Sequence, residues 1–400
     1  MKNALLISLL FSFHLANAQW TTLNSGTSEV LNEVFFPTAE TGYVIGNNGT
    51  ILKTSNGGSD WSFENTGLSV NFSDLYFISE LEGWVVGDSG SICHTMDGGD
   101  IWNCTFLDSA ERINLHSVFA LNSAALWVGG TKDYVDGYLA SSKNAGITWK
   151  IGNAESYIWS VDFKKIAMIN AYTGYAITRG YVVKTNDGGL NWHITDTASV
   201  QAGELFNVLE DLAVFPNSDT VYTCGWYSGY LGKTTNGGDK WVANNEFQNY
   251  NLDFINTEIG YIGGWGQVHK TSSGGATFVD ASGGNSELFN GINSIDFVDE
   301  WTGYACGENG KILKTTNGGL TAIAPLSLNT IIDIYPNPSS GQIYFSTTAN
   351  IQISTITGET IAEQKNVQSF DLSSLPAGVY SITLRDDAGR VIKREMVVKE

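Results

Sequence analysis

Seven side chains that lie in or beside irregular connections carry the chemistry of a binding surface. They combine large aromatic rings with two cations, and they are Lys132, Tyr134, Tyr138, Arg179, Trp226, Tyr227 and Trp265. Aromatic rings stack on sugars and on peptide side chains, so this set predicts a surface for a protein or glycan ligand. The alternative interpretation is that the same rings only pack their own loops.

Patterns of catalytic and metal-binding residues are absent from the sequence. The histidines, at positions 14, 94, 116, 193 and 269, do not pair at the spacing of metal ligands. There is no Gly-x-Ser-x-Gly turn, no phosphate-binding loop and no complete calcium loop. Asp and Glu are plentiful, but no pair stands out as the two carboxylates of a glycosidase. We therefore expect no catalytic residue, no metal and no cofactor, and we keep a polysaccharide-acting enzyme as the alternative function.

The segments that would position these residues repeat along the chain. Segment 54–61 (TSNGGSDW) recurs six times, starting at residues 95, 142, 185, 234, 271 and 315. Each copy follows three short β-rich runs that are separated by Gly/Asn turns, for example 34–36, 41–46 and 49–54. Four strands with a period in the forties are typical of a propeller blade. A solenoid is the alternative, although solenoid repeats are usually shorter.

The repeated segment has the composition of a tight turn. Its Asn or Asp can bind the backbone two residues ahead, and its glycines supply positive φ. The copies resemble the Asp-box, also called the BNR repeat, and 142–149 fits the form Ser-x-Asn-x-Gly-x-Thr-Trp best. The resemblance implies a hairpin that stabilises the fold rather than a catalytic site.

The last copy lacks a fourth strand, which the N-terminal residues can supply. Trp20 precedes Phe36 by 16 residues, and Trp61 precedes Phe77 by the same distance, so 20–26 reads as a fourth strand without its first three. Pairing with the last blade would close the ring and remove exposed sheet edges. The sequence thus predicts an all-β chain with a seven-bladed β-propeller over 19–323, followed by a small C-terminal β-sandwich.

The cysteines include one pair at the spacing of a hairpin. Cys93 and Cys104 have position numbers that sum to 197, as do Thr95 and Trp102, so a single antiparallel register aligns both couples. This register allows a cross-strand disulfide. Cys224 and Cys306 occupy equivalent places in different repeats, and we expect them to be small buried thiols.

The N-terminus has the pattern of a secretory signal peptide. Lys2 provides the positive charge, an apolar stretch follows over 4–15, and Ala16-Asn17-Ala18 is a small-x-small cleavage site. We expect a signal peptide over 1–18, with a buried N-terminal helix as the alternative. No later apolar run reaches about 18 residues, so we expect no transmembrane segment.

After a linker over 324–330, residues 331–400 form a different module. They contain Tyr335-Pro336-Asn337-Pro338, a block with Leu375-Pro376, Gly378 and Tyr380, and a final basic strand with Lys393. This module resembles the type A C-terminal sorting domain of the type IX secretion system. The resemblance implies a Bacteroidetes-type bacterium, the type IX machinery as a partner, and passage through the periplasm to secretion or surface attachment. An ordinary adhesive β-domain is the alternative.

The propeller resembles the photosystem II stability and assembly factors, which carry Thr-x-Asn/Asp-Gly-Gly-x-x-Trp boxes. The secreted setting implied by the tail argues against the same role. Sialidases also carry Asp-boxes, but a resemblance to sialidases implies three arginines that hold the carboxylate of the substrate. The propeller has only Arg112 and Arg179, which argues against sialidase activity.

Charge and composition narrow the choice of partners. The chain carries a formal charge of −20, which argues against nucleic-acid binding, because that needs clustered Lys and Arg. We therefore interpret the protein as a secreted or outer-membrane surface-attached propeller that binds an unknown protein or glycan ligand.

Overall fold

The structure is a computed structural model of the 400-residue chain, and part of the chain is described below. The described residues are 20–107, 112–133, 136–154, 162–178, 180–195, 209–225, 230–244, 250–264, 266–284, 286–320, 334–355, 360–385 and 391–399. The chain forms two compact units, Met1–Ala322 and Ile323–Glu400. No helix in the described ranges is long and apolar enough to cross a membrane. The signal peptide and linker expected over 1–18 and 324–330 lie outside these ranges and stay predictions.

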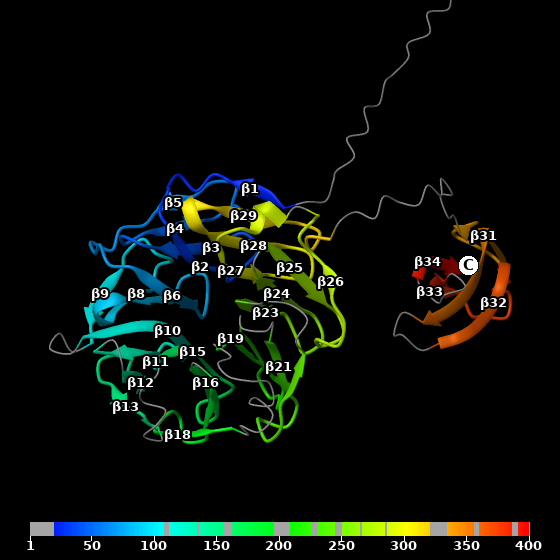
Figure 1. Ribbon diagram of the computed structural model, residues 1–400. Coiled ribbons are helices and arrows are strands. Elements are labelled where there is room, and N and C mark those ends of the chain that lie inside the picture. Colours follow the sequence, from blue (N-terminus) through cyan, green and yellow to red (C-terminus); the bar gives the residue numbers. More distant parts are fainter. Residues whose placement is uncertain are drawn as a thin grey trace, which may run out of the picture. The chain divides into compact units, whose positions relative to one another are not determined.

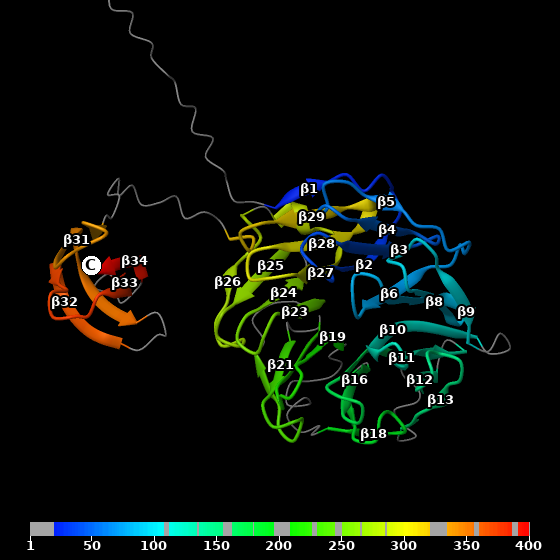
Figure 2. The same ribbon diagram turned by 180° about the vertical axis from the view of Figure 1, so that it is seen from behind.

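The first unit is a β-propeller of seven blades, whose innermost strands surround a common axis (Figures 1 and 2). Blades one to three comprise β2 (Leu31–Phe35), β3 (Gly42–Gly46), β4 (Ile51–Thr54), β5 (Ser62–Phe63); β6 (Phe72–Phe77), β7 (Gly83–Gly87), β8 (Ser91–Thr95), β9 (Asn103–Phe106); and β10 (Ile113–Asn122), β11 (Ala125–Lys132), β12 (Asp136–Ser142), β13 (Lys150–Ile151). Blade four comprises β15 (Phe163–Met168), β16 (Gly174–Thr178), β17 (Val182–Thr185) and β18 (Asn191–Ile194), with the short β14 (Asn153–Ala154) parallel to β18.

The remaining blades follow the same antiparallel order. They comprise β19 (Leu209–Val214), β20 (Val221–Gly225), β21 (Tyr230–Thr234), β22 (Val242–Asn244); β23 (Asn251–Phe254), β24 (Gly260–Gly264), β25 (Gln267–Thr271), β26 (Val279–Asp280); and β27 (Ile292–Phe297), β28 (Gly303–Gly307), β29 (Ile312–Thr315). Short 3-10 turns occur at η1 (Asp88–Gly90), η3 (Ser286–Phe289) and η4 (Glu308–Gly310). The prediction of an all-β, seven-bladed propeller is confirmed.

The N-terminal strand closes the ring. β1 (Thr21–Leu23) is the fourth strand of the last blade and pairs antiparallel with β29, with Thr21 opposite Lys314. Trp20 is only 3% exposed; its indole N–H donates to the Ala281 carbonyl at 2.8 Å, and its ring meets Phe289 and Phe297 edge-on. The chain therefore fastens its first strand to its last blade by pairing and by burial of one large aromatic ring.

Each repeated segment forms the turn between the third and fourth strands of a blade. In the first copy, Thr54 Oγ1 accepts from the Gly58 N–H at 2.9 Å, and Asn56 Oδ1 accepts from the Asp60 N–H at 3.0 Å. Gly57 and Gly58 have φ values of 64° and 83°, which side chains disfavour. The equivalent Thr or Ser accepts from the equivalent glycine in the other six copies. We call this turn the box turn.

The two ends of the ring carry different connections. Because the strands of a blade alternate in direction, the box turns share one face with the connections between first and second strands. The Gly57 N–H, for example, donates to the Glu40 carbonyl of such a connection at 2.8 Å. We call this end the box face. The connections between blades lie at the other end, with those between second and third strands, and we call it the blade-linking face.

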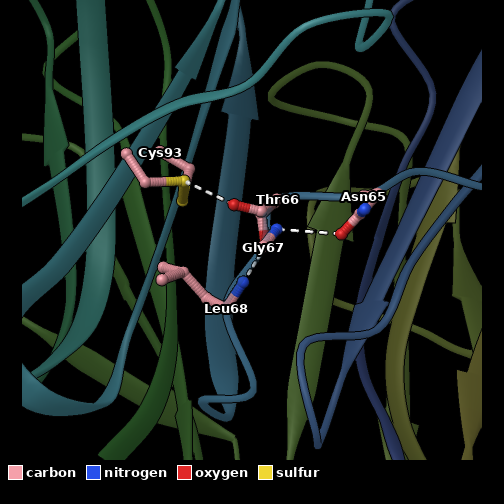
Figure 3. The surroundings of a disulfide bond; sticks show 6 residues. Asn65, Thr66, Gly67, Leu68 and Cys93 are labelled. Atoms are coloured by element: carbon pink, nitrogen blue, oxygen red, sulfur yellow. Dashed lines mark hydrogen bonds between the residues drawn. A yellow bond between two sulfur atoms is a disulfide. The ribbon is translucent and has the colours of Figure 1, made fainter.

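Blade two contains a cross-strand disulfide between Cys93 on β8 and Cys104 on β9. These two residues are register partners, and the neighbouring pairs His94–Asn103 and Ile92–Thr105 share the expected sum of 197. Cys104 Sγ lies 3.9 Å from the carbonyl oxygen of Thr66, in the link between blades one and two (Figure 3). Cys224 and Cys306 are buried free thiols, as the sequence suggested.

The second unit is a curved antiparallel sheet around its own core. It comprises β30 (Ile334–Tyr335), β31 (Gln342–Thr355), β32 (Thr360–Asp371), β33 (Gly378–Arg385) and β34 (Val391–Lys399). The long β31 pairs with β30, β32 and β33, so the sheet folds over a buried cluster that includes Ile343, Ile353 and Ile382. This sandwich-like form agrees with the predicted fold class.

We predict that Trp20→Ala destabilises the propeller by about 3–5 kcal/mol, because it removes a buried ring at the closure. Denaturant unfolding followed by circular dichroism measures the change. Trp301→Ala is the matched control: Trp301 is 47% exposed, and its main contact is a lysine ammonium 4.4 Å from its ring. An equal loss in both variants would show that closure does not depend on Trp20.

Candidate functional site

The centre of the propeller is lined by a ring of mostly polar side chains. In six of the seven blades the innermost strand has a register shift, as between Leu31 and Glu33 in blade one. Such a bulge re-aims the residue that follows it. We call the residues at this position the polar ring: Glu33, Asp74, Ser117, Lys165, Asp211, Asn251 and Ser294.

Several members of the polar ring join one blade to the next. Asp74 accepts from the Val118 N–H at 2.8 Å, Ser117 from Ile166 at 3.1 Å, and Asp211 from Leu252 at 2.9 Å. Ser294 makes the same bond to Val34 across the ring closure, at 3.3 Å. Buried backbone donors need such partners. These side chains therefore have a structural task, which limits what chemistry they can also perform.

Lys165 ties three blades together at the axis. Its ammonium, on β15 of blade four, lies 3.1 Å from Glu33 Oε1 of blade one and 3.0 Å from Asp74 Oδ1 of blade two. Asp74 is almost completely buried, whereas Lys165 and Glu33 keep about a quarter of their side-chain surface exposed. Removing one partner of such a buried pair leaves an uncompensated charge.

The pKa values in this cluster are set by burial and by the charges of its neighbours. Burial raises the pKa of Glu33 to about 8, although Lys165 opposes the rise. Burial also raises the pKa of Asp211. Burial disfavours the charged form of Lys165, but Asp74 and Glu33 hold its pKa well above the ordinary value. Burial therefore outweighs the attraction of the single ammonium at Glu33 and Asp211, and both groups have pKa values above the ordinary range.

A cavity of about 410 Å³ lies above this cluster, toward the blade-linking face. Its wall includes Lys164 and Glu210 from the bulges, with Tyr250 and Asn251 from the start of blade six. Lys164 Nζ lies 3.3 Å from Asp162 and 3.9 Å from Glu210. The wall is therefore polar and carries both signs of charge, which suits hydrogen bonding to a ligand.

His116 joins the same set of charges. Its Nε2 lies 3.3 Å from Asp162 Oδ1 and 3.4 Å from Thr131 Oγ1. Burial lowers the pKa of His116, although Asp162 opposes the change. A histidine of this kind is neutral at physiological pH and fixed by its neighbours.

Most residues of the predicted aromatic surface lie outside the described ranges: Tyr134, Arg179, Trp226, Tyr227 and Trp265. Lys132 is half-buried at the end of β11, opposite Ile113 and Asp136, on the blade-linking face. Tyr138 corrects the prediction, because it is only 5% exposed and packs in the core between blades two and three. It cannot serve as a platform for a ligand.

The sequence interpretation missed the polar ring and Lys165. The signal was present as a charged or polar residue before an apolar one in each inner strand, as in Glu33-Val34 and Asp74-Leu75. Lys164 and Lys165 are adjacent, and only the bulge decides which of them faces the axis. No group of three or more potential metal ligands gathers within the described part of the chain.

In the C-terminal unit the predicted sorting residues fix the ends of strands. Asn337 Oδ1 accepts from the Val398 N–H at 3.0 Å, and the Tyr380 hydroxyl donates to the Pro376 carbonyl at 2.8 Å. Leu375 packs against the core, and Gly378 and Lys393 lie opposite Lys399 and Leu384. Tyr335 stays 51% exposed and stacks on Tyr344 at 6.0 Å.

Comparisons with known families agree with both domain interpretations. Residues 13–109 and 65–208 match the family model of the photosynthesis system II assembly factor YCF48, and 333–399 match the secretion system C-terminal sorting domain. The propeller thus resembles the assembly factors, and the tail is a sorting domain. None of the curated proteins matches the chain.

Solved structures share the fold at low sequence identity. YCF48 bound to D1 peptide aligns with a TM-score of 0.60 and 18% identity, covering 74% of this chain and 97% of that one. An ancestral GH74 enzyme gives 0.56 and 12%, covering 94% and 55%. PorZ, a surface component of the type IX secretion system of Porphyromonas gingivalis, gives 0.53 and 12%, covering 94% and 59%. At these identities the likeness concerns the fold alone.

We predict that Lys165→Met destabilises the protein by about 3–5 kcal/mol at pH 8 and by less at pH 5. Burial raises the folded pKa values of Glu33 and Asp211 above their unfolded ones, and loss of the Lys165 ammonium removes the charge that opposes this rise. Such groups favour folding at low pH and lose that contribution as the pH rises. Denaturant unfolding at both pH values measures the difference.

Lys164→Met is the control for this prediction. The Lys164 ammonium lies at the cavity wall, near Asp162 and Glu210, rather than between Glu33 and Asp74. A loss in Lys165→Met that is equal at pH 5 and pH 8 would contradict the assignment of Lys165 as the counter-ion of the ring.

Proposed function

We propose that the protein is an exported binding module, which presents the blade-linking face of its propeller to a protein or glycan partner. The sorting domain indicates export through the type IX secretion system. Attachment to the outer-membrane surface after export belongs to the same proposal, with a signal peptide over 1–18 providing access to the periplasm.

The observation that carries the binding role is the polar cavity at the centre of the blade-linking face. Its charges are already paired with one another, as Lys164 is with Asp162, so the wall is preorganised without a ligand. The sequence predicts a binding surface on connections that share this face, with Lys132, Tyr134, Arg179, Trp226, Tyr227 and Trp265. Binding sites commonly combine aromatic side chains with a few polar groups, which is the combination that we propose for the blade-linking face.

A peptide segment is the first class of partner to test. The fold neighbour YCF48 has been determined with a D1 peptide, and PorZ is a surface component of the type IX system. These likenesses do not identify the ligand, but they support a protein partner at the cell surface.

A glycoside hydrolase is supported less well. Glu33 and Asp74 both contact Lys165, so their carboxyl groups lie close enough for a retaining mechanism. However, Asp74 also accepts the Val118 N–H and is almost fully buried. A nucleophile must reach a sugar carbon, and both oxygens of Asp74 already have partners within the ring.

We predict saturable binding of the full chain to a member of a peptide or glycan array, and at least tenfold weaker binding after Trp226→Ala with Tyr227→Ala. Trp301→Ala, which alters an exposed ring on the box face, should bind as the unmodified protein does. Unchanged affinity in the double variant would reject this surface. Hydrolysis of a glycan that stops in Glu33→Gln would instead establish the enzyme.

We also predict that removal of residues 333–399 prevents export. In a host with a type IX secretion system, the full chain should appear in the medium or on the surface, and the truncated chain should accumulate in the periplasm. Immunoblots of the cell fractions measure this distribution, with Trp301→Ala as an export-competent control. Equal export of both chains would show that the tail has another task.

A further inference from the structure

A second cavity, of about 240 Å³, lies on the box-face side of the Lys165 cluster. Its wall is formed two residues further along the inner strands than the polar ring. Alternate residues of a strand point to the same side, so these residues also face the axis. We call them the box-side ring: Phe35, Tyr76, Phe119, Ala167, Ala213, Asp253 and Asp296.

One side of the box-side ring is an arc of aromatic side chains from three successive blades. The Phe35 and Tyr76 ring centroids are 5.6 Å apart, and those of Tyr76 and Phe119 are 4.8 Å apart. All three rings are half-buried, so part of their surface faces the cavity. The next two blades contribute only Ala167 and Ala213, which leaves space beside the arc.

The other side of the ring holds two carboxyl groups. One oxygen of Asp296 accepts from the Phe36 N–H at 2.9 Å, and one oxygen of Asp253 accepts from the Phe297 N–H. Among the residues that the structure describes, neither Oδ1 has a hydrogen-bond donor. No cation of the described chain pairs with either group, since Lys165 contacts Glu33 and Asp74 instead.

The wall of this cavity has more acidic groups than basic ones. Its wall contains five carboxyl groups, those of Glu33, Asp74, Asp211, Asp253 and Asp296, and one ammonium, that of Lys165. Tyr76 is the remaining titratable group there, and burial raises its pKa. When ionised, these groups favour a cationic ligand over an anionic one.

We propose that the box-side cavity binds the ammonium end of a lysine side chain or of another primary alkylamine. The two unpartnered carboxyl oxygens accept its N–H groups, and the alkyl stem lies along Phe35, Tyr76 and Phe119. This site is separate from the blade-linking face, so it does not rest on the proposed function above.

The chemistry of the wall selects a primary ammonium over other cations. A quaternary ammonium would contact the aromatic faces but could not donate to Asp253 or Asp296. A metal ion would gain nothing from the aromatic arc. A flexible alkyl stem with a terminal donor fits both halves of the ring, because its methylene groups can cover apolar surface while the charged end stays polar.

Binding should release protons. Burial raises the pKa of Asp253 to about 7, and burial together with Asp253 raises the pKa of Asp296 well above its usual range. A bound cation favours the ionised forms, so affinity should increase with pH. If one proton is released, binding weakens by about tenfold for each pH unit below 7.

The test is calorimetric titration of the full chain with n-butylammonium chloride at pH 6 and pH 8. We expect saturable binding that is tighter at pH 8, and no binding of uncharged 1-butanol or of tetramethylammonium at the same concentrations. Binding of 1-butanol equal to that of n-butylammonium, or tighter binding at pH 6, would overturn the proposal.

Asp253→Asn with Asp296→Asn keeps an acceptor for each backbone N–H but removes both charges. We expect at least tenfold weaker binding at pH 8, and Asp299→Asn, in an exposed turn of blade seven, should bind normally. Tyr76→Leu, which keeps an apolar contact, should bind about threefold more weakly. Wild-type affinity in the double variant would also overturn the proposal.

Discussion

The ring depends on one repeated contact, in which a blade donates hydrogen bonds to a box-turn carbonyl of its neighbour. The Tyr304 hydroxyl donates to the Gly57 carbonyl at 3.0 Å, and the Lys314 ammonium donates to the same oxygen across the closure. Tyr175 with Lys184, and Tyr222 with Lys233, make the equivalent contacts to Gly237 and Gly274. The box turn therefore supplies the acceptor that holds one blade against the next, in addition to closing its own hairpin.

The same tyrosines link this outer contact to the core. Tyr304 stacks on Phe36 of blade one at 3.5 Å, and Tyr222 stacks on Phe254 of blade six at 3.9 Å. Phe36 directly follows the innermost strand β2, and Phe254 ends the innermost strand β23. Each tyrosine therefore has its hydroxyl fixed at the box face and its ring fixed against the end of an innermost strand. This chain of contacts orients the inner strands, and it thereby determines which of their side chains line the two central cavities.

The sequence was sufficient to predict the repeat and the ring closure, but not to predict which residues line the centre of the propeller. The Trp20 to Phe36 spacing predicted closure, because strand spacing is a local property that each repeat shares. Lys165 could not be singled out from Lys164, since the bulge that distinguishes them depends on pairing with β16. Tyr138 was expected at a surface because its loop departs from the repeat. It lies on β12, just after that loop, and its side chain packs in the core.

The residues around the axis of the propeller differ in how freely they can vary. One set of residues holds backbone N–H groups of the next blade, so changing them would loosen the ring; they are Asp74, Ser117, Asp211, Asp253, Ser294 and Asp296. Phe35, Tyr76 and Phe119 make no such hydrogen bond, and their rings contact one another instead. Replacing them with other apolar residues would alter the box-side cavity without removing a hydrogen bond between blades. A propeller built in this way can keep its frame while its ligand changes. Asp253 and Asp296 each use one carboxyl oxygen to hold the frame, so a ligand in the box-side cavity would use the other oxygen of each group and the aromatic arc opposite them.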